Sequence, residues 1–168
     1  MGYTTDKIRN VCLLGHGSTG KTSLAESMLF LTGASDRLGR VSDGNTVGDY
    51  DAEEIKRQIS ISAATLFTEY KGHKINIIDT PGYFDFAGEV SQAVRVADAG
   101  IIVCSAKGGV GVGAEKAWKA LSKHPKLFYI SKIDEENGDF NATFQALREK
   151  FGHTLSPLVF PIVKDGRV

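Results

Sequence analysis

The sequence has no excess of charge of either sign. Its 168 residues hold 20 lysines and arginines against 20 aspartates and glutamates. Without net positive charge, a chain has no bulk field that attracts nucleic acid or anionic lipid. We therefore expect no sequence-specific DNA binding and no membrane association, and any nucleic-acid partner must be contacted locally.

Cysteines and long apolar runs are scarce as well. Cys12 and Cys104 each lie in a short apolar run, as buried strand thiols do, and two cysteines cannot form the disulfide framework of a small secreted domain. No stretch reaches the roughly 18 apolar residues that a membrane-spanning helix needs, and residues 1–10 contain no apolar signal core. These absences favour a cytoplasmic protein, which we expect to be a monomer.

The chain does contain many short apolar runs, and 42% of its residues are apolar. The runs predict strands at 7–15, 59–70, 73–79, 101–106, 126–132 and, as a last candidate, 157–163. Helical spacing predicts helices at 21–33, 86–100, 113–124 and 139–153. Strands that alternate with helices predict an α/β three-layer sandwich, with a mainly parallel sheet, helices on both faces and ligands at the carboxyl ends of the strands.

Residues 15–22 have the sequence GHGSTGKT and fit the phosphate-binding pattern G-x-x-x-x-G-K-T/S, which makes the expected fold a P-loop NTPase. The segment follows a predicted strand and precedes a predicted helix, where backbone N–H groups can surround a phosphate. Lys21 would reach the outer phosphates, and Thr22 would offer its hydroxyl to Mg²⁺. These flanks disfavour a glycine-rich turn with an incidental lysine. The residues assigned to nucleotide binding are Gly15, His16, Gly17, Ser18, Thr19, Gly20, Lys21, Thr22 and Ser23.

A carboxylate stands at the tip of a second apolar run. Asp79 ends the run INIID and can hold magnesium, as the matching carboxylate does in other nucleotidases of this type. The amide of Gly82 can meet a terminal phosphate, which would make this loop sensitive to that phosphate. Alone, D-T-P-G could be an ordinary proline turn. Beside the phosphate loop, it predicts nucleotide contacts from Asp79, Thr80, Pro81 and Gly82.

The sequence SKID at residues 131–134, directly after a predicted strand, indicates which base the bound nucleotide carries. GTP-binding proteins carry N-K-x-D here, with the aspartate accepting hydrogen bonds from guanine and the lysine stem packing along the ring. Asp134 and Lys132 match this pattern, and Ser131 replaces the asparagine. Adenine lacks the two N–H donors that a carboxylate pairs with, so Asp134 favours guanine.

In this order, the motifs resemble those of the translational GTPases, most closely elongation factor G and its paralogues. The resemblance also includes DGNTVGDYDAEEIKRQISISAA and extends over nearly the whole chain. It implies GTP or GDP and Mg²⁺ as ligands, and a GTP-dependent switch that acts on the ribosome. The polar stretch 34–58, which is long for a connection, corresponds to switch I, with Ser60 in the place of a magnesium-binding threonine beside Thr22 and Asp79.

Three departures from the family pattern concern hydrolysis. Tyr83 stands where the family usually has a histidine that faces the attacking water, and Gly17 and Ser18 replace an apolar residue and an aspartate. Only Ile59 remains of the apolar pair that flanks the histidine. Unlike an imidazole, a phenol cannot take up a proton to become a cation near neutral pH, but its hydroxyl can hydrogen-bond to a water.

Three functions remain open on this basis. The first, which we favour, is a ribosome-linked GTPase in which Thr22, Ser60 and Asp79 arrange magnesium and Tyr83 helps to orient water under ribosomal stimulation. Its catalytic residues would be Tyr83, Lys21 and Gly82. The second is a guanine-nucleotide switch with little hydrolysis. The third is a P-loop ATPase or a small-molecule kinase.

The guanine-contacting S-A-K/L loop of GTPases is not found after Asp134. The SAK at 105–107 precedes that residue in the chain and is expected to end a strand instead. In elongation factor G an inserted subdomain separates the two motifs, and HTLSPLVFPIVKDGRV resembles its start. We therefore expect a GTP-binding domain at 1–152, incomplete at its C-terminus, and the start of the insertion at 153–168.

Overall fold

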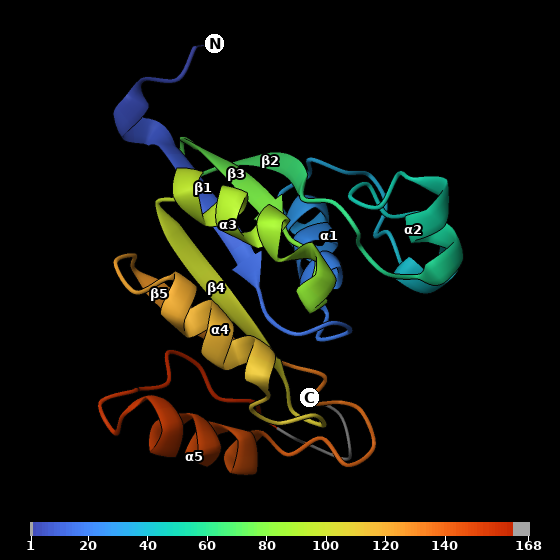
Figure 1. The fold of residues 1–168 in the computed structure, drawn as a ribbon. Helices are drawn as coiled ribbons and strands as arrows, with labels where there is room; N and C mark the ends of the chain where they lie inside the picture. The colour runs from blue at the N-terminus through green and yellow to red at the C-terminus, as the bar shows by residue number, and fades with distance from the viewer. Residues whose placement is uncertain (1, 163–168) are drawn as a thin grey trace.

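The computed structural model describes residues 2–162 (Figure 1). Its strands are β1 (Ile8–Leu14), β2 (Ala64–Tyr70), β3 (His73–Asp79), β4 (Ala99–Ser105) and β5 (Lys126–Ser131). Its α-helices are α1 (Lys21–Leu31), α2 (Ala52–Arg57), α3 (Ala87–Val96), α4 (Val112–Ala120) and α5 (Phe140–Phe151). Short 3₁₀ helices, η1 to η3, cover Thr5–Lys7, Val41–Asp43 and Phe84–Phe86.

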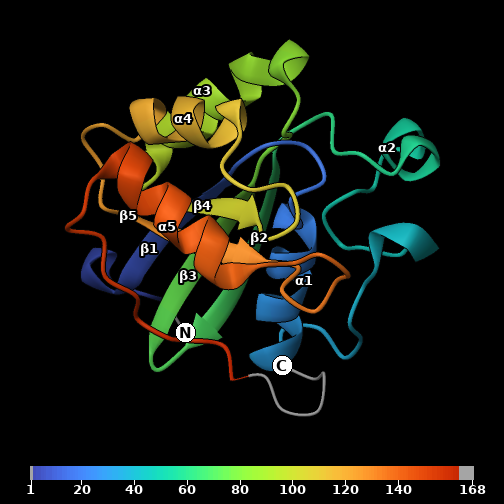
Figure 2. The ribbon, with the colours of Figure 1, turned by 90° about the horizontal axis from the view of Figure 1, so that it is seen from below.

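Within these residues the strands form one sheet in the order β2-β3-β1-β4-β5. All neighbouring strands are parallel except β2, which is antiparallel to β3. α1 covers one face of the sheet, and α3, α4 and α5 cover the other (Figures 1 and 2). The predicted three-layer α/β sandwich with a mainly parallel sheet is confirmed.

The alternation of side chains along each strand divides the core into two parts. Leu13 of β1 and Ile77 of β3 are fully buried against α1. Cys12 belongs to the cluster on the other face, together with Cys104 of β4. Both cysteines are free thiols, and burial raises the pKa of each to about 11. The expectation of buried strand thiols is therefore confirmed.

The carboxyl ends of four strands meet at one edge of the sheet. Leu13 near the end of β1 lies beside Asp79, the last residue of β3. Ser105 at the end of β4 lies beside Ser131 at the end of β5. Ser105 thus ends a strand, as expected for the SAK segment. The register brings the phosphate loop, the DTPG segment and the SKID segment to the same edge.

The polar stretch 34–58 is more ordered than the sequence indicates. It contains α2, which lies at one side of the molecule, away from the sheet (Figures 1 and 2). A capping box of Asp51 and Glu54 begins this helix, and Gln58 ends it with φ of 55°. Since each of these residues satisfies a free backbone group at a helix end, six residues suffice for a helix here.

One strand prediction was too long and another was wrong. The strand expected at 59–70 begins only at Ala64, because side-chain carboxylates accept the preceding N–H groups: Glu54 those of Ile61 and Ser62, and Glu89 that of Ala63. The strand expected at 157–163 is wrong for residues 157–162, which include two prolines without an N–H to donate. Residue 163 lies outside the described part.

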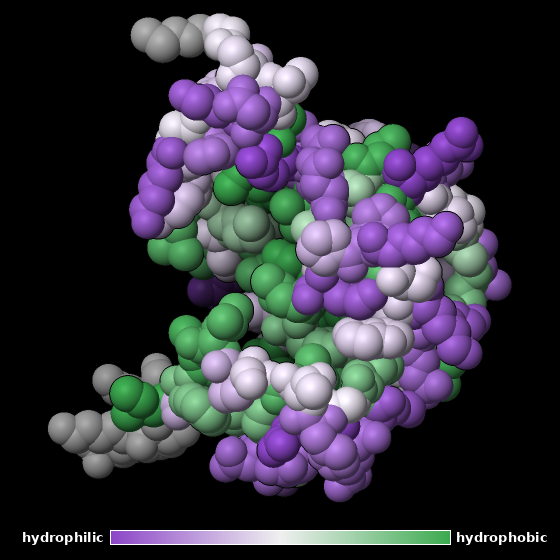
Figure 3. Space-filling model, turned by 90° about the vertical axis from the view of Figure 1, so that its left-hand side faces the viewer, coloured by the Kyte–Doolittle hydropathy of each residue, from purple (hydrophilic) through white to green (hydrophobic). Residues whose placement is uncertain are grey.

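The surface combines polar and apolar regions. On the face shown in Figure 3, apolar side chains gather around a hollow in the middle, and polar side chains surround them. The edge strand β5 exposes Leu127 and Tyr129. Between residues 2 and 162, no helix has the length and apolar character required to cross a bilayer.

Candidate functional site: a nucleotide cavity

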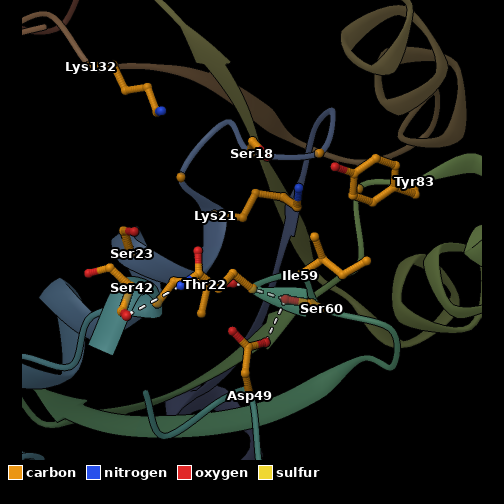
Figure 4. A pocket seen from close by; sticks show the side chains of 15 residues that line it. Ser18, Lys21, Thr22, Ser23, Ser42, Asp49, Ile59, Ser60, Tyr83 and Lys132 are labelled. Atoms are coloured by element: carbon orange, nitrogen blue, oxygen red, sulfur yellow. Dashed lines mark hydrogen bonds between the residues drawn. The ribbon is translucent and has the colours of Figure 1, made fainter. Parts of the chain in front are cut away.

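A cavity of about 240 Å³ opens at the edge of the sheet where the strands end (Figure 4). Its walls come from four segments: the phosphate loop with the start of α1, the switch I segment, the loop after β3, and the loop after β5. The lining residues are Gly17, Ser18, Gly20, Lys21, Thr22, Ser23, Val41, Ser42, Asp49, Gln58, Ile59, Ser60, Gly82, Tyr83 and Lys132.

The phosphate loop leads into the N-terminus of α1. Gly20 is the N-cap residue in a left-handed conformation, with φ of 90°, which glycine adopts without strain. No side chain caps this helix. The first N–H groups of an α-helix have no partner within it, and together they favour an anion. The start of α1 therefore fits a phosphate group.

The side chain of Lys21 is held inside the loop. Its amine donates hydrogen bonds to the carbonyl oxygens of His16 (2.8 Å) and Gly15 (3.3 Å). Lys21 is 6% exposed, and this burial lowers its pKa to about 8, while the nearby carboxylate of Asp79 opposes the shift. Phosphate oxygens near the amine would supply the negative charge that a buried cation needs.

Two carboxylates and two hydroxyls form a connected group below the loop. Thr22 donates a hydrogen bond to Oδ2 of Asp79 (2.6 Å), and the hydroxyls of Thr22 and Ser60 lie 3.2 Å apart. Ser60 in turn donates to Oδ1 of Asp49 (2.7 Å). Three of these residues are the predicted magnesium ligands. Asp49 is an addition, because nothing in the sequence distinguishes it from the other acidic residues of the polar stretch.

The buried carboxylate of Asp79 provides a test of whether this group fits a cation. Asp79 is 2% exposed, and its Oδ1 has no hydrogen-bond partner among the described residues. Burial raises the pKa of Asp79 to about 6 and also raises that of Asp49. Mg²⁺ prefers hard oxygen ligands and is commonly held by one or two carboxylates together with phosphate oxygens and waters. The oxygens of Thr22, Ser60 and Asp79 fit this requirement.

The loop after β3 lies directly against the phosphate loop. A β-carbon at Gly82 would be 2.5 Å from Nζ of Lys21 and closer still to the backbone nitrogen of Gly17, so only glycine fits here. Tyr83 follows on the cavity wall and is 37% exposed. The hydroxyl of Thr80 donates to the carbonyl of Leu13 (2.6 Å) and is fully buried, so this side chain joins β3 to β1.

At the other end of the cavity, Ser131 connects the SKID segment to the phosphate loop. Its hydroxyl donates to the carbonyl of Thr19 (2.6 Å) and also lies 3.2 Å from the carbonyl of Cys104. Lys132 lines the cavity with φ of 58°, and its amine pairs with Glu135 (3.1 Å). Asp134 is exposed and is not on the cavity wall. The serine thus keeps a direct connection between the two motifs.

These features define a phosphate-loop nucleotidase domain of the kind found in GTPases: a mainly parallel sheet with a phosphate loop after β1 and a buried carboxylate at the end of β3. The family described as the Elongation factor Tu GTP binding domain matches residues 6–164, and the chain belongs to this family. The predicted P-loop NTPase fold and the resemblance to translational GTPases are therefore confirmed. The alternative of an ATPase or small-molecule kinase has no support.

Similar proteins include translation factors. Elongation factor G from Granulibacter bethesdensis is 39% identical over 159 residues, which are 94% of this chain and 23% of the relative. The mitochondrial ribosome-releasing factor 2 of Culex quinquefasciatus is 35% identical over 163 residues, 96% of this chain and 22% of the relative. The chain thus spans less than a quarter of the length of these relatives.

Solved structures share the fold of this chain. A protein of Thermus thermophilus superposes with a TM-score of 0.90 at 36% identity, over 96% of this chain and 24% of that one. A bacterial selenocysteine-specific elongation factor superposes with a TM-score of 0.67 at 21% identity, over 86% of this chain and 23% of that one, and shows a shared fold.

Proposed function

We propose that the chain is the GTP-binding and GTP-hydrolysing domain of a ribosome-associated translation factor similar to elongation factor G. One observation carries the proposal: the buried amine of Lys21 and the hydroxyl of Thr22 lie at one cavity, and that hydroxyl donates to the buried carboxylate of Asp79 directly behind it. Family membership and the names of the relatives support guanine nucleotide as the ligand and the ribosome as the partner.

In the proposed complex the phosphates lie across the phosphate loop and the N-terminus of α1. Lys21 would face the outer phosphates, and Thr22, Ser60 and Asp79 would hold Mg²⁺, which would neutralise charge on the phosphate oxygens. The carboxylate of Asp134 and the stem of Lys132 face the guanine base, and Ser131 keeps their segment against the phosphate loop. The exposed position of Asp134 leaves its carboxylate free to pair with a base.

Hydrolysis in this arrangement is attack of a water on the terminal phosphorus with loss of GDP. The bond from phosphorus to the bridging oxygen breaks, and its electron pair leaves with GDP. The oxygen of the water joins the inorganic phosphate, and the protons of the water go to that phosphate and to solvent. The N–H of Gly82 faces the terminal phosphate, and the hydroxyl of Tyr83 accepts or donates one hydrogen bond to the water. The partial exposure of Tyr83 on the cavity wall supports this role.

The remaining proposals concern the chain as a whole. We place the GTP-binding domain at 1–152, supported by the end of α5 at Phe151, and the start of an inserted subdomain at 153–168. The protein acts as a cytoplasmic monomer, without a membrane or a specific DNA sequence as partner. The balance of 20 basic and 20 acidic residues supports the last two points.

The second candidate function is a guanine-nucleotide switch that hydrolyses little GTP. Tyr83 favours it, because a phenol carries no positive charge near neutral pH and cannot act as an imidazolium would. Both candidates use the same cavity and the same nucleotide. They differ in whether the terminal phosphate is released on the ribosome.

The experiment that separates them measures ribosome-stimulated phosphate release by the full-length protein, with Tyr83→Phe beside it. We expect ribosomes to accelerate release, and the loss of the hydroxyl to slow the stimulated rate by about tenfold or more, since a misplacement of about 1 Å between reacting groups can cost a hundredfold. A rate that ribosomes leave unchanged would remove the hydrolase proposal and leave the switch.

A further inference from the structure

The ring of Tyr83 lies directly over Gly17 of the phosphate loop. A β-carbon at position 17 would lie 2.8 Å from Cε2 and Cζ of Tyr83 and 3.2 Å from Cε1. Non-bonded carbon atoms pack best at about 3.5–4.0 Å. The hydroxyl-bearing end of the phenol therefore fills the space that a side chain at position 17 would need.

The backbone itself does not require glycine at this position. Gly15 and Gly20 of the same loop have φ of 145° and 90°, in the region that favours glycine, whereas Gly17 is not among the glycines with positive φ. An alanine can therefore adopt the backbone conformation of residue 17 without strain. What opposes a β-carbon at position 17 is the Tyr83 ring.

The main chain that carries Tyr83 is fixed close to Gly17. The close approach of Gly82 to the backbone nitrogen of Gly17 leaves the two loops in direct contact. The Tyr83 side chain thus starts from a defined place beside the phosphate loop. A side chain added at position 17 would therefore displace the Tyr83 ring by rotation about its side-chain torsions, because the backbone atoms are held by their neighbours.

Tyr83 also separates two cavities. The first is the nucleotide cavity, and the hydroxyl of Tyr83 is directed toward the loop that carries Ser18 (Figure 4). The second has about 190 Å³ and lies between η3, α3 and α4, with Phe84, Val90 and Lys116 in its walls. A ring displaced from Gly17 can enter this second cavity, which adjoins it. In that position its hydroxyl would no longer face the nucleotide.

We propose that Gly17 is a positioning residue for Tyr83. Because it has no side chain, the phenol can lie over the phosphate loop with its hydroxyl at the nucleotide cavity. The inference rests on the proposed hydrolysis, in which that hydroxyl orients the attacking water. The departures from the family pattern at positions 17 and 83 then belong together, since the ring at one position occupies the space left free at the other.

The test is a double-mutant cycle in the full-length protein, with Gly17→Ala, Tyr83→Ala and the two combined. We expect Gly17→Ala to lower ribosome-stimulated kcat by about tenfold or more when Tyr83 is present, because a misplacement of about 1 Å can cost a hundredfold. With Tyr83→Ala in the same chain, the further loss should be below about twofold, as for uncoupled sites. Equal losses in both backgrounds would overturn the proposal.

Two controls separate positioning from damage to the loop. Gly88→Ala in α3 places a β-carbon where nothing lies within 4 Å, and its rate should equal that of the unmodified protein. Because Gly17 lines the nucleotide cavity, the dissociation constant for GDP is measured in both backgrounds: Gly17→Ala should change it by the same factor with Tyr83 and with Tyr83→Ala. A loss of kcat that only follows a loss of GDP binding would overturn the proposal, because the damage would then lie in the loop itself.

A second measurement does not depend on hydrolysis. Labelling of the full-length protein with 3-fluorotyrosine gives one ¹⁹F resonance for each tyrosine, and Tyr83→Phe assigns the one of interest. We expect Gly17→Ala to shift the Tyr83 resonance and to leave the other resonances in place. If the unmodified protein releases no phosphate, the proposed hydrolysis falls, while a shifted Tyr83 signal still supports positioning by Gly17. An unshifted signal would overturn it.

Discussion

At the scale of single residues, the site depends on small side chains that can each donate only one hydrogen bond. Ser131 illustrates this. A hydroxyl has one proton, so Ser131 cannot donate to the carbonyls of Thr19 and Cys104 at once, and the shorter distance, 2.6 Å, identifies Thr19 as the acceptor. An asparagine at this position would have two protons to donate. The connection between the SKID segment and the phosphate loop is therefore a single bond.

We predict that Ser131→Ala weakens GDP binding. The loss of one hydrogen bond, with the Thr19 carbonyl left partly buried, costs about 1 kcal/mol, or about fivefold in the dissociation constant. Titration with a fluorescent GDP analogue measures this change. Ser131→Thr is the matched control, because it keeps the hydroxyl and should bind within about twofold of the unmodified protein. Equal affinities for the alanine and threonine variants would contradict the prediction.

At the scale of elements, the switch I segment is held by carboxylates rather than by a strand. Glu54 is 3% exposed, and its Oε1 accepts the N–H groups of Ile61 (2.9 Å) and Ser62 (3.0 Å). Its Oε2 accepts the N–H of Asp51 (3.3 Å) at the start of α2. One side chain thus ties α2 to the residues that follow Ser60, and so helps to fix the hydroxyl of Ser60 near that of Thr22.

Glu54→Gln should therefore loosen this segment. The amide replaces one acceptor oxygen by a donor, which leaves at least one buried N–H without a partner and costs about 1–3 kcal/mol of the free energy of unfolding. Urea denaturation measures the loss, and limited proteolysis should show faster cleavage between residues 40 and 63.

Glu53→Gln is the control for this prediction. Glu53 pairs with Arg57 (2.9 Å) on the same helix, but its side chain is 51% exposed. An exposed pair of this kind contributes less than about 1 kcal/mol. If the variants at Glu53 and Glu54 unfolded at the same urea concentration, the buried carboxylate would not hold the segment as the structure indicates.

The elements that the sequence predicted well are those with a strong local pattern. β3 lies at 73–79 as expected, and the phosphate loop lies between β1 and α1. α2 was missed because its six residues are too few to show a helical period, and its stability comes from the capping residues Asp51 and Glu54. The start of β2 was misplaced because the N–H groups before it donate to the side chains of Glu54 and Glu89 and not to a neighbouring strand. These side chains are distant in sequence, so no local pattern reveals them.

The site shows the same division. Motif spacing was enough to predict that Lys21 and Asp79 lie near each other, because one follows the end of β1, the other ends β3, and these parallel strands are neighbours. The approach of Asp49 to Ser60 and of Tyr83 to Gly17 depends on how separate loops cross. Such contacts between loops depend on the packing of the whole domain, so patterns in a single sequence do not predict them.

At the scale of the whole molecule, a guanine nucleotide would join segments that start from different strands. The phosphate end has a formed cavity, whereas Asp134 is exposed and lies off the cavity wall. In the proposed complex, base selectivity would therefore depend on a residue that gains its main contact only when the nucleotide binds. The free energy of this contact should appear as a difference between guanine and adenine nucleotides in their effect on the stability of the fold.

We predict that GDP with Mg²⁺ raises the melting temperature of the full-length protein more than ADP with Mg²⁺ does. A ligand at 100 times its dissociation constant stabilises the folded state by about 2.7 kcal/mol, and a ligand below its dissociation constant hardly does so. Asp134→Ala should reduce the effect of GDP to that of ADP, because the carboxylate that pairs with guanine is gone. Asp139→Ala, which removes the N-cap of α5, is the control for damage to this region: it should lower the melting temperature without nucleotide and keep the preference for GDP. A preference for GDP that survives Asp134→Ala would show that the base is selected elsewhere.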